Sequence, residues 1–115
     1  IRDKKGGDCY LITKNRIEAY FEEGSYEVLS EMKGTDLKGM TYEPLFDFAK
    51  KVVNTDNAWT VQLDDYVSDE SGTGIVHLAC FGEDDVRIFK REDIPIFDPV
   101  DDEGIFWSTW DLLLE

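Results

Sequence analysis

The residue best suited to acid–base or recognition chemistry is His77, the only imidazole in this chain of 115 residues. A Gly-Thr-Gly turn at residues 72–74 precedes it in an apolar run, and an acidic step at residues 83–85 follows it. Glycine lets a ligand approach the backbone closely. A carboxylate at the start of a helix can receive a ligand's ammonium group, and exposed N–H groups can bind an oxyanion. The spacing predicts one pocket between a strand end and the next helix, although a histidine in a strand is more often a hydrogen-bonded structural residue.

Other kinds of site fit the sequence poorly. The acids at residues 64–70 suggest a calcium loop, but residues 66–68 are Tyr, Val and Ser, where an EF-hand register needs liganding acids. One histidine with Cys9 and Cys80 far apart cannot supply the four ligands of a zinc site, and we expect two free thiols rather than a disulfide. There is no Gly-x-Ser-x-Gly sequence, and the Gly-Thr-Gly turn lacks a Walker lysine.

The composition describes a folded and very acidic domain. The chain has 26 Asp and Glu against 12 Lys and Arg, a net charge of -14, and 42% hydrophobic residues. This apolar content excludes a disordered acidic tail, and the charge repels phosphates, so any nucleic acid must be held mainly by something else. No apolar run of about 18–20 residues and no signal peptide is present, so we expect no membrane partner. Because the chain opens with Ile1 and has no linker, we expect residues 1–115 to be a single domain cut from a longer protein.

Hydropathy patterns and turn residues divide the chain into short elements. Helices are predicted at residues 15–22, with Ile17, Tyr20 and Phe21 on one face, and at residues 83–91, where acids open the helix. A capping signal predicts a last helical turn at residues 109–114. Strands are expected at residues 9–13, 26–32, 59–63, 75–79 and 94–97. These elements predict a mixed α/β (α+β) fold of short strands with a few short helices.

Six motifs then occur in order along the chain. They are Gly-Thr-Asp-Leu-Lys-Gly at 34–39, Tyr-Glu-Pro-Leu-Phe-Asp at 42–47, Asp-Tyr-Val at 65–67, Gly-Thr-Gly-Ile-Val-His at 72–77, Phe-Gly-Glu-Asp-Asp at 81–85, and Pro-Val-Asp at 99–101 with Gly104 and Phe106. Together they resemble the editing domain inserted into isoleucyl-tRNA synthetase. The resemblance runs from about residue 10 to residue 106, and the motif at 42–47 is similar to the eukaryotic cytosolic branch.

The resemblance implies a compact, barrel-like editing domain within a cytoplasmic enzyme that attaches isoleucine to tRNA using ATP and Mg²⁺. The inserted domain would hydrolyse valine mistakenly attached to tRNA(Ile) and would need no cofactor or metal of its own. Its partner would be the 3′ end of tRNA(Ile) carrying valine, held mainly by the rest of the parent enzyme. We expect the isolated domain to be a monomer.

The same resemblance assigns roles to residues. His77 would gauge the amino-acid side chain, and Asp85 would hold the α-ammonium of the aminoacyl group, with Asp84 as the alternative. Thr73 and Gly74 would belong to the substrate-binding residues. Water would be the nucleophile, with no covalent enzyme intermediate.

The chain departs from the family pattern at two places, and a second interpretation of its function therefore remains. The first departure is the absence of the family's Thr-rich segment, which normally comes just before the point where this chain starts. The family also reads His-x-Ala-Pro-x-Phe-Gly, whereas this chain has Cys80 in the place of the Pro and is one residue shorter between His77 and Asp85. The alternative function is a non-catalytic, acidic protein-interaction domain in which His77 and Asp85 are structural.

Overall fold

A computed structural model describes residues 1–45, 50 and 56–106. The chain divides into two compact units, and each is described by itself. The first comprises Ile1–Asp36 and Leu63–Leu78, and the second Leu37–Gln62 and Ala79–Glu115. The helical turn predicted at residues 109–114 and the end of the 42–47 motif lie outside the described residues. Within the described part of the chain, no helix has the length and apolarity needed to cross a bilayer.

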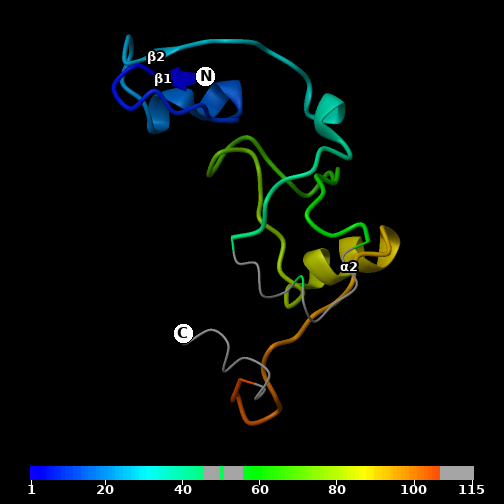
Figure 1. Ribbon diagram of the computed structural model, residues 1–115. Helices are drawn as coiled ribbons and strands as arrows, with labels where there is room; N and C mark the ends of the chain where they lie inside the picture. The colour runs from blue at the N-terminus through cyan, green and yellow to red at the C-terminus, as the bar shows by residue number, and fades with distance from the viewer. Residues whose placement is uncertain (46–49, 51–55, 107–115) are drawn as a thin grey trace. The chain divides into compact units, whose positions relative to one another are not determined.

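The first unit contains an antiparallel strand pair, β1 (Arg2–Asp3) with β2 (Tyr26–Glu27), in which Arg2 pairs with Glu27 and Asp3 with Tyr26 (Figure 1). The carboxylate of Asp3 accepts the N–H groups of Lys5 and Gly6, at 3.0 and 3.1 Å, and so closes the turn that follows β1. After this turn the chain returns past β1, where Cys9 forms an isolated bridge with Arg2.

The helix predicted at residues 15–22 is present as a shorter 3₁₀ helix, η1 (Lys14–Ala19). Its buried residue is Ile17, which is 8% exposed. The carbonyl of Ile17 accepts N–H groups from both Tyr20 and Phe21, so the last turn tightens and the helix stops. The Phe21 ring packs on Tyr10 at 5.3 Å between centroids. Tyr20, by contrast, is exposed, so only part of the predicted apolar face is covered.

Most of the predicted strands were wrong. Only residues 26–27 of the segment 26–32 form a strand, residues 9–13 contribute the single bridge at Cys9, and residues 75–79 and 94–97 are irregular. At residues 59–63 the structure has one isolated bridge, Thr41 to Thr60, flanked by a hydrogen bond from the Tyr42 N–H to the Trp59 carbonyl at 3.0 Å. Trp59 has a φ of 51°, which no extended strand allows. An alternating pattern becomes a strand only where a neighbouring strand pairs with it.

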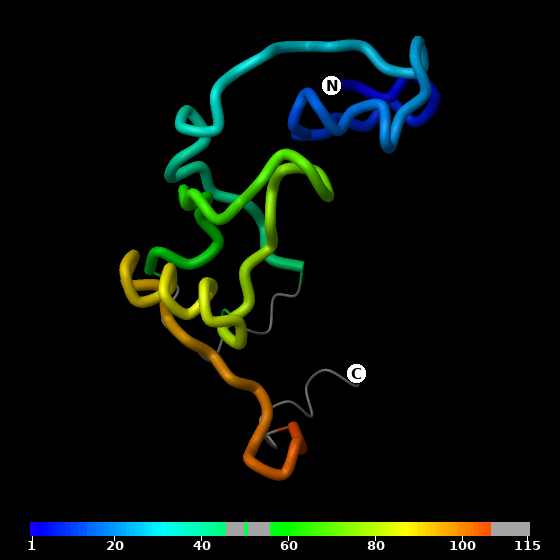
Figure 2. Tube along the Cα trace, turned by 180° about the vertical axis from the view of Figure 1, so that it is seen from behind, coloured from blue at the N-terminus to red at the C-terminus, as the bar shows by residue number. Residues whose placement is uncertain are grey.

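The helix predicted at residues 83–91 was confirmed with the same bounds, as α2 (Glu83–Arg91). Three acids occupy its first turn, and Lys90 and Arg91 its last, so that both ends match the helix dipole. Ile88 is the buried residue, 1% exposed, while Val86 and Phe89 are half-buried. Beyond α2 the Ile94 N–H donates to the Phe89 carbonyl at 2.8 Å, which caps the helix. Figure 2 shows the chain leaving this cap as an extended segment.

A 3₁₀ turn, η2 (Gly34–Leu37), covers the start of the first family motif. Near the other end of the described chain, Val100 and Phe106 form an isolated bridge around a turn. The carboxylate of Asp101 accepts the N–H groups of Glu103 and Ile105 inside that turn, each at 2.9 Å. The turn expected at residues 101–104 is therefore present, stabilised by its own aspartate.

Candidate functional site in two parts

The Gly-Thr-Gly turn is held in place by η1 and the residue before it. The Thr13 N–H donates to the Thr73 carbonyl at 2.8 Å, and Nε of Arg16 donates to the Gly72 carbonyl at 3.0 Å. The Asn15 side chain also donates to the Asp69 carboxylate, just before the turn. These supporting residues were not predicted, because nothing local in the sequence links residues 13–16 to residues 69–73.

Gly74 is required by both its backbone and its surroundings. Its φ is 78°, and a Cβ there would lie 2.6 Å from Cβ of Thr13 and 2.8 Å from its Cγ2. We expected this turn to allow the close approach of a ligand. In the structure, the group in close contact with Gly74 is the side chain of Thr13.

Replacing Gly74 by Ala should therefore lower the free energy of unfolding by about 2–4 kcal/mol, the sum of a left-handed backbone strain and a steric overlap. Thr13 cannot relieve the overlap by rotation, because its Cβ is fixed to a backbone that is hydrogen-bonded to Thr73. Gly72→Ala is the matched control, since Gly72 has a φ of 56° but nothing within 4 Å of its Cβ position. That variant should lose only about 1–2 kcal/mol. Urea titrations of the two variants measure the difference, and equal losses would contradict the Thr13 contact.

His77 lies in the first unit, on the irregular segment that follows the turn, and its side chain is exposed. Ile75 and Val76 beside it are also about half exposed, at 47% and 48%. The prediction that His77 lies in a strand at residues 75–79 was therefore wrong. The backbone that leads to His77 is held instead at the turn at residues 72–74, whose carbonyls accept hydrogen bonds from Thr13 and Arg16.

Asp85 lies in the second unit, in the first turn of α2, and is half-buried. Its Oδ2 accepts the N–H of Ala79 at 3.1 Å. Asp84 differs from it: its carboxylate is exposed and pairs with Arg87 of the same helix at 3.2 Å. A half-buried carboxylate with a fixed orientation is the better binding group for an ammonium, because an exposed ion pair is weakened by solvent. Of the two acids considered from the sequence, the geometry favours Asp85.

The loop at residues 79–82 joins the segment of His77 to α2 and contains the departure from the family pattern. Here the Phe81 N–H donates to the Ala79 carbonyl at 2.9 Å, which makes a tight turn. The thiol of Cys80 donates to the Phe97 carbonyl at 3.0 Å. A proline side chain has no donor for this hydrogen bond. Cys80 therefore links the loop to the chain beyond α2 in a way that the family's proline could not. Both Cys80 and Cys9 are free thiols.

The structure thus gathers the predicted residues in two groups. Thr73, Gly74 and His77 lie on one segment of the first unit, and Asp84 and Asp85 lie in one helical turn of the second unit. The single pocket expected from the sequence remains a prediction.

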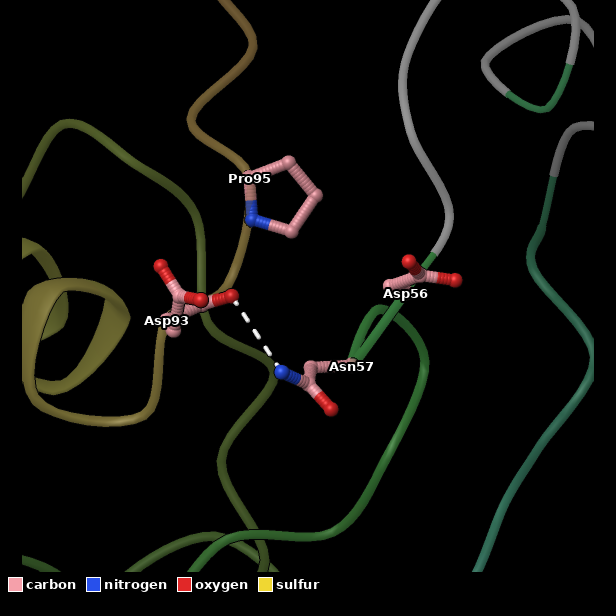
Figure 3. Close-up of a pocket in the computed structure, with 4 residues that line it drawn as sticks. All are labelled: Asp56, Asn57, Asp93 and Pro95. Carbon is pink, nitrogen blue, oxygen red and sulfur yellow. Dashed lines mark hydrogen bonds between the residues drawn. The ribbon is translucent and has the colours of Figure 1, made fainter.

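In the described part of the second unit, no predicted site residue lines either of two pockets. The larger, of about 540 Å³, is lined by Asp56, Asn57, Asp93 and Pro95. Figure 3 shows the Asn57 amide directed at the Asp93 carbonyl, 3.5 Å away. The smaller, of about 320 Å³, includes Tyr42 and Trp59, and partial burial raises the pKa of the Tyr42 phenol above its usual value of 10.0. Among the described residues, no group of three or more His, Cys, Asp or Glu side chains could hold a metal ion.

Comparison with known proteins identifies the chain's relatives. Isoleucine–tRNA ligase, cytoplasmic, of Mus musculus is 41% identical over 114 residues, which cover 92% of this chain and 9% of the relative. Isoleucine–tRNA ligase of Treponema denticola is 41% identical over 116 residues, covering 87% of this chain and 10% of the relative. That of Corynebacterium efficiens is 42% identical over 105 residues, covering 89% and 10%. The chain is homologous to a segment of isoleucine–tRNA ligase.

The chain spans about a tenth of the length of the curated relatives it matches. No protein-family model matches it. The relatives are enzymes by name, so the chain is homologous to part of an enzyme. These identities support the resemblance to isoleucyl-tRNA synthetase that was inferred from the six motifs.

Proposed function

We propose that this segment is the editing domain of an isoleucine–tRNA ligase and that it hydrolyses valine mistakenly attached to tRNA(Ile). The observation that carries the proposal is the half-buried carboxylate of Asp85, oriented by the Ala79 N–H at the start of α2, in a chain homologous to these ligases. The motif at residues 42–47 supports a eukaryotic cytosolic type, in the cytoplasm. The proposed fold of the whole domain is the compact barrel of such editing domains. The isolated domain is proposed to be a monomer.

The need for such a site follows from the size of the substrates. Valine differs from isoleucine by one methylene, and an apolar pocket distinguishes them by only about 1–3 kcal/mol. A synthetic site that accepts isoleucine therefore also accepts some valine. A second site that excludes the larger side chain removes the smaller, incorrect product.

Each residue then has a defined task. Asp85 binds the α-ammonium by a charge-assisted hydrogen bond. His77 limits the room for the side chain, so that the valyl group enters and the isoleucyl group does not. Thr73 and Gly74 belong to the substrate-binding residues, and water attacks the ester. Editing uses no cofactor, while ATP and Mg²⁺ serve the aminoacylation site of the parent enzyme.

The charge of the segment determines how its tRNA partner is held. A net charge of -14 repels the phosphate backbone. The rest of the ligase must therefore hold the tRNA body and present only its 3′ end to this domain.

The test is the hydrolysis of valyl-tRNA(Ile) and isoleucyl-tRNA(Ile) by a full-length ligase that carries this segment. We expect the valyl ester to be cleaved and the isoleucyl ester to be spared. Equal rates for the two esters would contradict a second sieve.

A further inference from the structure

The orientation of the Asp85 carboxylate depends on the loop at residues 79–82. One oxygen of the carboxylate, Oδ2, accepts the Ala79 N–H at 3.1 Å, and this bond fixes the direction in which the other oxygen points. The helix itself starts from the same loop, because the Val86 N–H donates to the Gly82 carbonyl at 2.8 Å. Loop and carboxylate therefore form one hydrogen-bonded unit.

Gly82 is the residue of this loop that lies against the carboxylate. A Cβ at Gly82 would lie 3.3 Å from Cγ of Asp85, 3.4 Å from its Oδ2 and 3.6 Å from its Oδ1. The backbone of Gly82, with φ of -82° and ψ of 148°, is allowed for any residue. A Cβ at this position would therefore be in tight contact with the Asp85 carboxylate, which would have to shift by a few tenths of an ångström, while the backbone itself would not be strained.

We propose that Gly82 is a positioning residue for editing: the absence of a Cβ there lets Asp85 keep its bond to Ala79 and face the α-ammonium of the aminoacyl group. This inference rests on the proposed function of Asp85. A Cβ would displace the carboxylate by a few tenths of an ångström and so weaken its hydrogen bond to the Ala79 N–H, which is 3.1 Å long. The thiol of Cys80 donates to the Phe97 carbonyl at 3.0 Å and so links the same loop to the chain beyond α2.

The substitution Gly82→Ala in the full-length ligase tests this role. We expect kcat/KM for hydrolysis of valyl-tRNA(Ile) to fall by about threefold to tenfold, less than the cost of misplacing a binding group by a full ångström. Gly34→Ala is the matched control, because a Cβ at Gly34 has nothing within 4 Å and its φ is not left-handed. That variant should remain within about twofold of the unsubstituted enzyme.

A third variant separates steric displacement from a loss of helix capping. Gly82 is the N-cap of α2, and serine is a better N-cap than alanine. Gly82→Ser restores the cap but keeps the Cβ, so a steric effect predicts the same loss of editing in both variants. Recovery of editing in Gly82→Ser would overturn the proposal.

Amide hydrogen exchange at Ala79 gives a measurement that does not depend on editing. We expect faster exchange at Ala79 in Gly82→Ala and Gly82→Ser, and unchanged exchange in Gly34→Ala. Unchanged exchange in all three variants would overturn the positioning role. If exchange accelerates while hydrolysis of valyl-tRNA(Ile) is unaffected, Gly82 still positions Asp85, and the proposed function of Asp85 fails instead.

Discussion

Replacing Asp85 by Ala in a full-length ligase that carries this segment should lower the hydrolysis of valyl-tRNA(Ile) by about 10-fold to 150-fold. A hydrogen bond to a charged group contributes about 1.5–3 kcal/mol, and each 1.4 kcal/mol changes a rate tenfold. Without this half-buried carboxylate, the α-ammonium of the aminoacyl group loses its partner in the first turn of α2. Single-turnover deacylation measures the loss, and isoleucine activation should stay unchanged.

Two further variants show which property of Asp85 is used. Asp85→Asn keeps an oxygen for the Ala79 N–H but removes the charge, so it should lose editing nearly as fully as Asp85→Ala. Asp84→Ala removes only the exposed pair with Arg87 and should change editing by less than about threefold. If Asp85→Ala edits normally, Asp85 is structural, and the segment is better described as an acidic interaction domain.

Replacing His77 by Ala should open the sieve, so that correctly charged isoleucyl-tRNA(Ile) is hydrolysed. Exclusion of one methylene is worth about 10-fold to 200-fold, and the rate for the isoleucyl ester should rise within that range. The exposure of His77 in the structure means that this substitution should leave the free energy of unfolding nearly unchanged. Deacylation of isoleucyl-tRNA(Ile) measures the effect.

The control for this prediction is Val76→Ala, which changes the exposed neighbour of His77 on the same segment. It should leave isoleucyl-tRNA(Ile) intact. Continued rejection of the isoleucyl ester by His77→Ala would contradict the role of His77 as the sieve.

The sequence predicted α2 because the signals for a helix are local. Its first turn carries three acids and its last turn Lys90 and Arg91, and each set acts on the dipole of its own helix end. These signals did not identify the buried residue of the helix, Ile88, which is 1% exposed. A short helix has too few turns to define its buried face by pattern alone.

Strands could not be predicted in the same way, because a strand depends on a partner elsewhere in the chain. The segment at residues 59–63 alternates clearly, yet Trp59 has a φ of 51° and Thr60 makes only one bridge. The same limit applies to the site. The motifs indicated His77 and Asp85, but the contacts that hold their segments, from Thr13 to Gly74 and from Ala79 to Asp85, join residues whose sequence carries no sign of the pairing.

The most direct test of whether this segment removes valine from tRNA(Ile) compares the intact ligase with the same ligase lacking the segment. Deacylation of valyl-tRNA(Ile) and isoleucyl-tRNA(Ile) is followed in both, with isoleucine activation as the check that each enzyme is folded. We predict that only the ligase with the segment hydrolyses the valyl ester and that neither hydrolyses the isoleucyl ester. Equal hydrolysis of valyl-tRNA(Ile) by an active ligase without the segment would contradict the account.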